Sequence, residues 1–532
     1  MNTAPHNLPD NVAALKEIIL TLTNQYDNRI HSLEQANRLL EEEKKVLLHR
    51  LFGSRSEKLS PEDHLQGRLF DEAETHREED DSASDHPEPA ITVQPYTRRK
   101  PGRKPLPESL PRVSIIHDID ENEKRCACGG ELTCIGEEVS EKLDIIPAKI
   151  QVLRHVRYKY ACRQCEGTED DTPAVKTAPM PAQMVPQGIV SPGLLAWVMT
   201  SKFCDALPFY RQEKLFARIG VDISRATQCN WAMAAHRSCS RLLALMWQDL
   251  IASPLVGMDE THVQVMQEPG RKNTTKSYMW VFRGGGRDRP LVMFRYHPTR
   301  GSDFINREFA EYTGVIQTDG YQGYAALGKK EQVTHAACWA HVRRKFKDAH
   351  KGSSDQSIPH AMIDMIGMLY EVEAKIRENA YSPEKTIEVR QKESVPVVGK
   401  IEAYLTTHVH HVAPKSLTGK AIAYTMSLWQ HLCVYLKNPA VSIDNNMVEN
   451  AIRPFVVGRK NWLFSGSPRG ADASAGLYSI IETARANGLE PYWYLRYLFE
   501  KLPTCASDDE IKLLMPHSIP PESVANFRSG VN

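Results

Sequence analysis

The chain lacks a net charge, a long hydrophobic run and the pattern of a secretion signal. Its 532 residues include 66 Lys and Arg against 66 Asp and Glu. No apolar run approaches the ~18 residues that a membrane span needs, and no basic-then-apolar segment opens the chain. These absences predict a cytoplasmic protein without a membrane partner.

The zero net charge does not exclude a nucleic-acid partner, because the charge is segregated. Acidic residues crowd the segment 57–88, whereas basic triplets occur at 98–100 and 343–345. Local patches matter more than the sum for binding DNA. The length predicts several domains. The 11 cysteines, without a signal sequence, favour a reducing compartment in which clustered cysteines bind metal.

Residues 11–52 contain neither Pro nor Gly and carry a heptad repeat, which predicts one long helix. Asn37 falls on the apolar seam, where a buried Asn commonly fixes a parallel two-stranded register. We therefore predict a dimeric coiled coil. The alternative is an amphipathic helix that packs on its own domain. The apolar residues that recur every seven positions are Ile19, Tyr26, Leu33, Leu40 and Leu47.

A linker is predicted over residues 56–110, acidic first and then basic. The acidic part has few large apolar residues, which is typical of disordered chain. The run RRKPGRKP at 98–105, which includes Arg103, can lie extended in an A·T-rich minor groove. A solvated basic linker is the alternative.

Two cysteine pairs close a β-rich segment and predict a zinc ribbon within residues 111–175. Four thiolates suffice for tetrahedral Zn²⁺. The second pair has the C-x-x-C spacing of a knuckle, whereas the first is one residue short, so Cys134 is an alternative ligand. Unliganded core cysteines are the other interpretation. The predicted zinc ligands are Cys126, Cys128, Cys162 and Cys165.

Residues 176–250 have a helical pattern that predicts a helix-turn-helix. One helix is expected over 209–219, and a second begins after Ser224, a suitable N-cap. An ordinary αα-hairpin has the same pattern. If the motif binds DNA, the second helix presents four polar side chains to a groove, namely Arg225, Thr227, Gln228 and Asn230.

Residues 255–331 change to the period of strands. Asp259 lies within the first predicted strand and Asp319 follows the last, so two such strands side by side would bring the carboxylates together. The glycine triplet at 284–286 lacks the Lys and Ser/Thr of a P-loop. Strands are predicted over 255–265, 277–282, 291–296 and 314–317, and a helix over 303–312.

Glu449 is expected to join the two aspartates from a helix, after a helical insertion. Three carboxylates can hold two Mg²⁺ ions (or Mn²⁺) for phosphodiester hydrolysis and strand transfer. Each acid also has an alternative. Glu260 is a candidate in place of Asp259, Asp319 could belong to a simple turn, and Glu449 lies at capping distance after Asn446.

Basic residues near these acids are candidates for phosphate contacts, with a solvated surface as the alternative for each. They are Arg343, Arg344, Lys345, Arg453, Arg459 and Lys460. For the nearby pair Cys338-x-x-His341 we expect a structural role rather than zinc binding, because His335 is the only obvious extra ligand.

The order of these features resembles the IS66-type (TnpC-like) insertion-sequence transposases. The motif DNNMVENAIRP at 444–454, continued by GRKNW at 458–462, carries the likeness. E-x-L-D-x-I-P-A at 141–148 and V-R-x-K-Y-x-C at 156–162 resemble that family's zinc-ribbon region. The resemblance implies a ribonuclease-H-like core whose DDE triad is Asp259, Asp319 and Glu449. It also implies small accessory proteins encoded by the same element.

The predicted fold is multidomain α/β, with a ribonuclease-H-like catalytic core, a helical insertion, an N-terminal coiled coil, a zinc ribbon and a helix-turn-helix. The expected segments are 1–55 (coiled coil), 56–110 (linker), 111–175 (zinc ribbon), 176–250 (helical, DNA-binding), 251–355 and 441–488 (core), 356–440 (insertion) and 489–532 (C-terminal segment).

The predicted function is a DNA transposase that binds the terminal inverted repeats of an insertion sequence. It would cleave there with a metal and transfer the 3′ end to target DNA. Both ends must be synapsed, so a homodimer or higher oligomer is expected. Two rivals stay open: a catalytically inactive DNA-binding regulator, and a nuclease of the same core without strand transfer.

Overall fold

The computed structural model describes residues 11–52, 150–161, 175–286, 288–351 and 357–531. The chain divides into two compact units, Glu78–Ala178 and the remainder. Among the described helices, none has the length and apolar character needed to cross a membrane. The predicted linker, Arg103 and the predicted zinc ligands Cys126, Cys128, Cys162 and Cys165 lie outside the described residues.

The N-terminal segment forms the predicted helix, α1 (Val12–Phe52). The Asn11 side chain caps it by accepting a hydrogen bond from the Ala13 amide at 2.9 Å. In the smaller unit, the described residues form a short antiparallel pair, β1 (Lys159–Ala161) and β2 (Val175–Thr177). The Arg157 guanidinium extends this pairing by donating to the Ala178 carbonyl.

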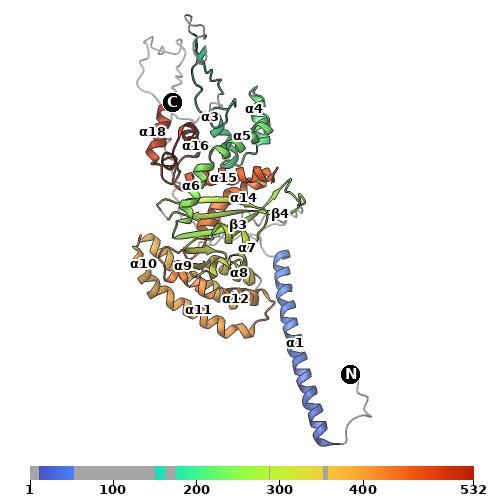
Figure 1. The fold of residues 1–532 in the computed structure, drawn as a ribbon. Coiled ribbons are helices and arrows are strands. Elements are labelled where there is room, and N and C mark those ends of the chain that lie inside the picture. Colours follow the sequence, from blue (N-terminus) through green and yellow to red (C-terminus); the bar gives the residue numbers. More distant parts are fainter. Residues whose placement is uncertain (1–10, 53–149, 162–174, 287, 352–356, 532) are drawn as a thin grey trace, which may run out of the picture. The chain divides into compact units, whose positions relative to one another are not determined.

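A mixed sheet organises the described part of residues 179–532 (Figure 1). The strand order is β5-β4-β3-β6-β7; the β5-β4 and β4-β3 pairs are antiparallel, and the β3-β6 and β6-β7 pairs are parallel. The short β8 lies parallel to the end of β3. The strands are β3 (Leu255–Val265), β4 (Lys276–Gly284), β5 (Leu291–His297), β6 (Gly314–Thr318), β7 (Val333–Ala337) and β8 (Phe464–Ser465).

Helices cover the sheet on both sides, with α14 and α15 drawn above it and α8, α9 and α12 below it in Figure 1. The helices that precede the insertion are α3 (Pro192–Phe203), α4 (Phe209–Arg218), α5 (Arg225–Ser238), α6 (Ser240–Ile251), α7 (Ser302–Glu308) and α8 (Trp339–His350). Those of the insertion are α9 (Ile358–Glu378), α10 (Pro383–Val389), α11 (Val395–His408), α12 (Leu417–Ser427) and α13 (Trp429–Leu432). The last are α14 (Asn446–Trp462), α15 (Pro468–Ala486), α16 (Pro491–Lys501), α17 (Asp508–Lys512) and α18 (Pro521–Val531).

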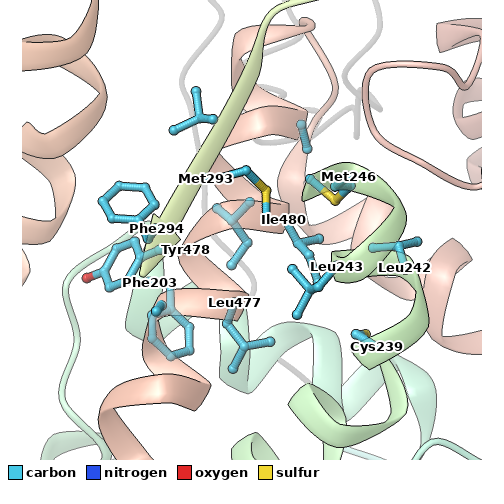
Figure 2. Packing of buried hydrophobic residues seen from close by; sticks show 14 of the residues in the cluster. Phe203, Cys239, Leu242, Leu243, Met246, Met293, Phe294, Leu477, Tyr478 and Ile480 are labelled. Atoms are coloured by element: carbon cyan, nitrogen blue, oxygen red, sulfur yellow. The ribbon is translucent and has the colours of Figure 1, made fainter. Parts of the chain in front are cut away.

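The main core forms where α3, α6 and α15 pack against β5. Figure 2 shows side chains from these elements converging, among them Phe203, Met246, Met293, Phe294 and Tyr478. The Tyr478 ring packs against Phe203 and Phe294, with ring centroids 4.9 and 5.6 Å apart. Aromatic pairs at these separations stabilise a core beyond the area they bury. The core thereby joins the helical segment before the sheet to the helix that follows it.

Helix α15 also covers the outer edge of β5. The amides of Val292 and Phe294 donate to the hydroxyls of Thr483 and Ser479, at 3.0 and 2.8 Å. A bare strand edge is a template for pairing with another chain, and a covering helix removes it. The sheet is therefore closed on this side by side chains of its own chain.

The insertion is helical, as predicted, and has a core of its own behind β6 and β7. Trp339 and Ile366 are among its fully buried residues. The indole of Trp339 donates to the Leu432 carbonyl at 3.0 Å, which fixes α8 to α13. Inside the insertion, Arg390 forms a buried ion pair with Glu373 at 2.7 Å. The insertion thus packs against the strand that leads to Asp319.

Four predicted strands are confirmed, and β3 has the predicted bounds. The predicted helix over 303–312 ends at Glu308, because Tyr312 turns into the core and donates its hydroxyl to the Ser253 and Val315 carbonyls. The strand β7 was not predicted. The helix pair α4 and α5 is confirmed, with Ser224 as N-cap accepting the Thr227 amide at 3.1 Å.

Candidate active site at the centre of the sheet

Two aspartates meet where β3 and β6 lie side by side. The parallel register places Leu255 opposite Val315 and Gly257 opposite Gln317. Continued by two residues, this register sets Asp259 opposite Asp319, which directly follows β6. The two strands predicted to bring these carboxylates together are therefore neighbours in the sheet.

The turn after β6 holds Asp319 in place. Gly320 has φ +83°, and a Cβ there would lie 2.4 Å from the Leu428 Cδ1 of the insertion, so only glycine fits. The Tyr321 amide donates to Asp319 Oδ1 at 2.8 Å. From α12, the Tyr424 hydroxyl donates to the Asp319 carbonyl. The turn and the insertion together fix this acid.

Helix α14 brings Glu449 beside β3. The Asn445 side chain, just before the helix, donates to the Met258 carbonyl at 3.1 Å. A Cβ at Gly257 would lie 2.3 Å from Val448 Cγ2, so the glycine permits the close approach of helix and strand. Glu449 therefore lies in the first turn of a helix that is in contact with the strand of Asp259.

Along one edge of β3, between the residues that pair with β6 and those that pair with β8, helix α14 and the residue just before it supply hydrogen bonds from their side chains. On this edge β6 pairs with residues 255–257 and β8 with residues 264–265. Between them, Asn445 donates to the Met258 carbonyl, and Arg459 donates to the His262 carbonyl and to Thr261 Oγ1. Buried backbone carbonyls need such partners. The two ends of α14 thus anchor it along β3.

The other two acids lie close enough to Asp259 to act on its carboxyl group. Burial raises the pKa of the Asp259 carboxyl well above its usual range, and the nearby Glu260, Glu449 and Asp319 raise that pKa further. Like charges gathered in a low-dielectric site favour a proton or a cation. Oxygen-rich donor sets are those that Mg²⁺ and Mn²⁺ prefer, so the residues fit a divalent ion.

Glu260, the alternative acid, is engaged elsewhere. Its carboxylate accepts a hydrogen bond from Arg300 Nε at 2.5 Å and another from the Tyr324 hydroxyl. Its side chain is only 2% exposed. The buried Glu260 therefore forms an ion pair with the partly exposed Arg300 beside the site, and the geometry favours Asp259 as the acid that faces Asp319.

Helix α8 contacts Glu449 from the other side. His341 Nδ1 lies 3.7 Å from Glu449 Oε1, and Arg344 lies 3.6 Å from Oε2. Burial, with Arg344, lowers the pKa of His341 to about 4, so this imidazole is neutral at pH 7. The spacing of Cys338 and His341 was visible in the sequence, but their contact with Glu449 was not.

The predicted DNA-contacting residues differ in exposure. On α8, Lys345 is exposed and Arg343 and Arg344 are half-buried; on α14, Lys460 is exposed and Arg453 and Arg459 are half-buried. At the start of α5, Arg225 is exposed. Gln228 is buried, and its amide donates to the Ile223 carbonyl at 3.2 Å. A side chain held inside the hairpin cannot reach a groove, so we withdraw Gln228 as a DNA contact.

An acidic cluster on a mixed sheet, covered by helices that carry basic residues, is an arrangement suited to phosphate chemistry on nucleic acid. Comparison with protein families gives the class. Residues 187–473 match the description Transposase IS66 family, and the chain belongs to that family. Residues 123–166 match the zinc-finger binding domain of transposase IS66, residues 479–517 the IS66 C-terminal element, and residues 39–115 the Transposase C of IS166 homeodomain.

Relatives of similar length occur in Sinorhizobium fredii. The uncharacterized protein y4qI is 31% identical over 97% of this chain and 99% of its own length. The uncharacterized protein y4jD is 32% identical over 77% of this chain and 81% of its own length. The likeness to y4qI therefore extends beyond the sheet and its helices to nearly the whole chain.

Proposed function

We propose that this protein is an active DNA transposase of the DDE type. One observation carries the proposal: β3 and β6 set Asp259 opposite Asp319, and α14 brings Glu449 against the same strand. We infer that the sheet is a ribonuclease-H-like core. Its three antiparallel strands followed by two parallel ones, with the acids on the central pair and on a later helix, support that assignment.

In the proposed mechanism the three carboxylates would hold divalent cations, Mg²⁺ or Mn²⁺. When bound, such ions activate a water or a 3′-hydroxyl and stabilise the leaving oxygen. The chain fixes one oxygen of each aspartate by a backbone amide, Glu260 N on Asp259 and Tyr321 N on Asp319, both at 2.8 Å. These bonds orient the carboxylates before substrate arrives. Cleavage at the element end and attack on target DNA would use the same site.

DNA would be held by cations on the two helices that meet at Glu449. We propose that Arg343, Arg344 and Lys345 on α8, with Arg453 and Lys460 on α14, contact phosphates. Arg459 is engaged with β3, so we assign it a structural role in the site. The exposed Arg225 at the start of α5 is proposed to contact terminal-repeat DNA, because recognition helices place N-terminal residues in the groove.

Other parts of the chain are proposed to bind zinc, DNA and protein partners. We propose that Cys126, Cys128, Cys162 and Cys165 bind a structural Zn²⁺, which the zinc-finger match supports. Arg103 is proposed to contact the minor groove. The heptad residues of α1 are proposed to pair two copies of the chain. The domain boundaries predicted from the sequence are kept in this proposal. Accessory proteins of the same element are further proposed partners.

The test is a cleavage assay on the element's own terminal DNA, with Mg²⁺ or with EDTA. We expect nicks at the element end that leave a 3′-hydroxyl, and joined products when target DNA is added. Nicks without joined products would favour a nuclease. Tight end binding with no metal-dependent nick, even with the element's accessory proteins present, would favour a DNA-binding regulator.

A further inference from the structure

A sulfur and a nitrogen donor lie beside Glu449. Cys338 directly precedes α8, and His341 is in its first turn. One ligand atom from each of Cys338, His341 and Glu449 lies within 4.8 Å of the others. Among the described residues these three form a group that can enclose a metal ion. The donor set is mixed, with one thiol, one imidazole and one carboxylate.

We propose that Cys338, His341 and Glu449 form a second metal site, selective for a thiophilic divalent cation such as Zn²⁺, whose occupation inhibits catalysis. Thiolate and imidazole ligands select Zn²⁺ over Mg²⁺, which prefers oxygen ligands alone. The site is therefore chemically distinct from the carboxylate site, although the two share Glu449. The inhibition rests on the proposed function, whereas the metal site itself does not.

The geometry needs little change to accept the ion. Zn–S bonds of about 2.3 Å and Zn–N or Zn–O bonds of about 2.0 Å place tetrahedral ligand atoms roughly 3.5 Å apart. His341 Nδ1 and Glu449 Oε1 are already 3.7 Å apart. The Cys338 sulfur accepts a hydrogen bond from the Asn445 amide at 3.2 Å, which orients it.

Two features make this an exchangeable site rather than a structural one. Three protein ligands leave the fourth position to water, as in open zinc sites, whereas structural sites are closed by four. Arg344 lies 3.6 Å from Glu449 and opposes a further cation. Binding also releases one proton from the buried Cys338 thiol to solvent, as the metal–sulfur bond replaces the S–H bond. The open fourth position, the nearby Arg344 and the proton release together predict that this site binds Zn²⁺ less tightly than a four-cysteine ribbon does.

Occupation of this site changes what Glu449 can do. A Glu449 carboxylate bonded to a Zn²⁺ ion that Cys338 and His341 also hold is no longer available to a catalytic cation held with Asp259 and Asp319. The carboxylate site then loses its third ligand while the fold stays intact. Inhibition by Zn²⁺ at fixed Mg²⁺ should therefore depend on Cys338, a residue outside the acidic triad.

The experiment uses the full chain, loaded with Zn²⁺ and freed of unbound metal, and titrates Co²⁺. Thiolate-bound Co²⁺ absorbs in the near ultraviolet, and Co²⁺ binds such ligands less tightly than Zn²⁺, so it leaves filled four-cysteine sites in place. We expect a thiolate band with the intensity of one thiolate-bound Co²⁺ per chain, whatever further Co²⁺ the carboxylates bind. The band should vanish in Cys338→Ala, weaken in His341→Gln and persist in the control Cys433→Ala, a half-buried thiol of the insertion.

Further measurements test the same metal site. Arg344→Gln should tighten Co²⁺ binding by roughly fivefold, the size of one partly screened charge interaction. Zn²⁺ should bleach the band, and Zn²⁺ inhibition of cleavage should be lost in Cys338→Ala relative to that variant's own rate. If Cys338→Ala does not fold, as judged by circular dichroism, His341→Gln decides. No band in the wild type, or equal bands in the wild type and both variants, would overturn the site, whatever the cleavage assay shows.

Discussion

Helices α14 and α1 use their apolar faces in opposite ways. In α14, Phe455 is fully buried, and the helix is anchored to β3 at both ends by Asn445 and Arg459. In α1, the described seam residues Ile19, Tyr26, Leu33 and Leu40 are 51–66% exposed in the single chain. Helix α14 buries its apolar face within the chain, whereas α1 exposes a regular stripe of apolar residues.

Because of this difference, a single chain positions Glu449 but leaves the pairing of α1 open. The contacts of α14 determine the position of Glu449, so the candidate chemistry can be argued from one copy. A seam of large apolar residues repeating every seven positions is typical of a helix whose partner is another helix. The pairing of α1 with a second copy therefore stays a prediction, and experiments must address it separately from the site.

The largest effect is expected on cleavage, from substitutions of the acids that α14 and β3 carry. Asp259→Asn and Glu449→Gln each remove a charge from the cluster and should lower cleavage by about 10³-fold, because metal-held charge stabilisation amounts to several kcal/mol. End binding, measured by mobility shift in EDTA, should change little. Glu311→Gln, an exposed acid before β6, is the matched control and should cleave normally. Cleavage retained in both triad variants would remove these acids from the chemistry.

The pairing of α1 with a second chain is tested by the double substitution Leu33→Glu with Leu40→Glu. Charge on both seam positions should dissociate a coiled coil, so light scattering should report a single chain of 60.1 kDa instead of a multiple of it. Because both side chains are exposed in one copy, the fold of each chain should be unaffected. Asn28→Glu, away from the seam, is the control. An unchanged mass in the double variant would mean that α1 does not pair chains.

The close contact of α14 with β3 can be broken by a single methyl group. Gly257→Ala places a Cβ 2.3 Å from Val448 Cγ2 and should destabilise the chain by about 1–3 kcal/mol, the usual range for overpacking. Cleavage should fall as well, since Glu449 is carried by the displaced helix. Gly399→Ala in α11 meets nothing within 4 Å and should be neutral or stabilising. Urea unfolding of the two variants measures the contrast.

The sequence predicted the strands beside the candidate acids because the signals there are local. An apolar strand that contains Asp259, and another that ends at Asp319, are legible from period and composition alone. The strand β7 was missed because Val333–Ala337 is short and contains a small, weakly alternating set of side chains. Gly257 was overlooked, although an isolated glycine inside a strand indicates a close backbone approach.

Other features could not be predicted, because they depend on which distant segments meet. Nothing local to Glu449 reveals that His341 and Arg344 lie beside it, more than 100 residues earlier in the chain. Gln228 and Arg225 look equally suited to DNA in sequence, yet only the packing of α4 against α5 shows that Gln228 is buried. Arg459 likewise resembles a phosphate ligand until its contacts with β3 are known.

A smaller effect concerns stability and pH. A carboxyl whose pKa is raised on folding binds more protons in the folded state. Its ionisation therefore destabilises the fold as pH rises from the usual pKa of about 4 towards the raised value. In EDTA, Asp259→Asn should melt a few degrees above wild type at neutral pH, since about 1 kcal/mol shifts Tm by ~2–4 °C. The gap should close at acid pH and shrink with Mg²⁺. A gap that grows on acidification would contradict the assignment.

The last prediction separates two neighbouring cations of α14. Lys460 is exposed, so Lys460→Ala should weaken binding to all DNA sequences equally by a few-fold, and the slope of log affinity against log salt should fall by ~1 if it contacts one phosphate. Arg459 donates to β3, so Arg459→Ala should lower stability by about 1.5–3 kcal/mol, the range for hydrogen bonds from a charged group. Salt-dependent anisotropy and urea unfolding of both variants distinguish the roles. A salt slope that falls in Arg459→Ala but not in Lys460→Ala would reverse them, and would place the DNA along β3 rather than over the exposed face of α14.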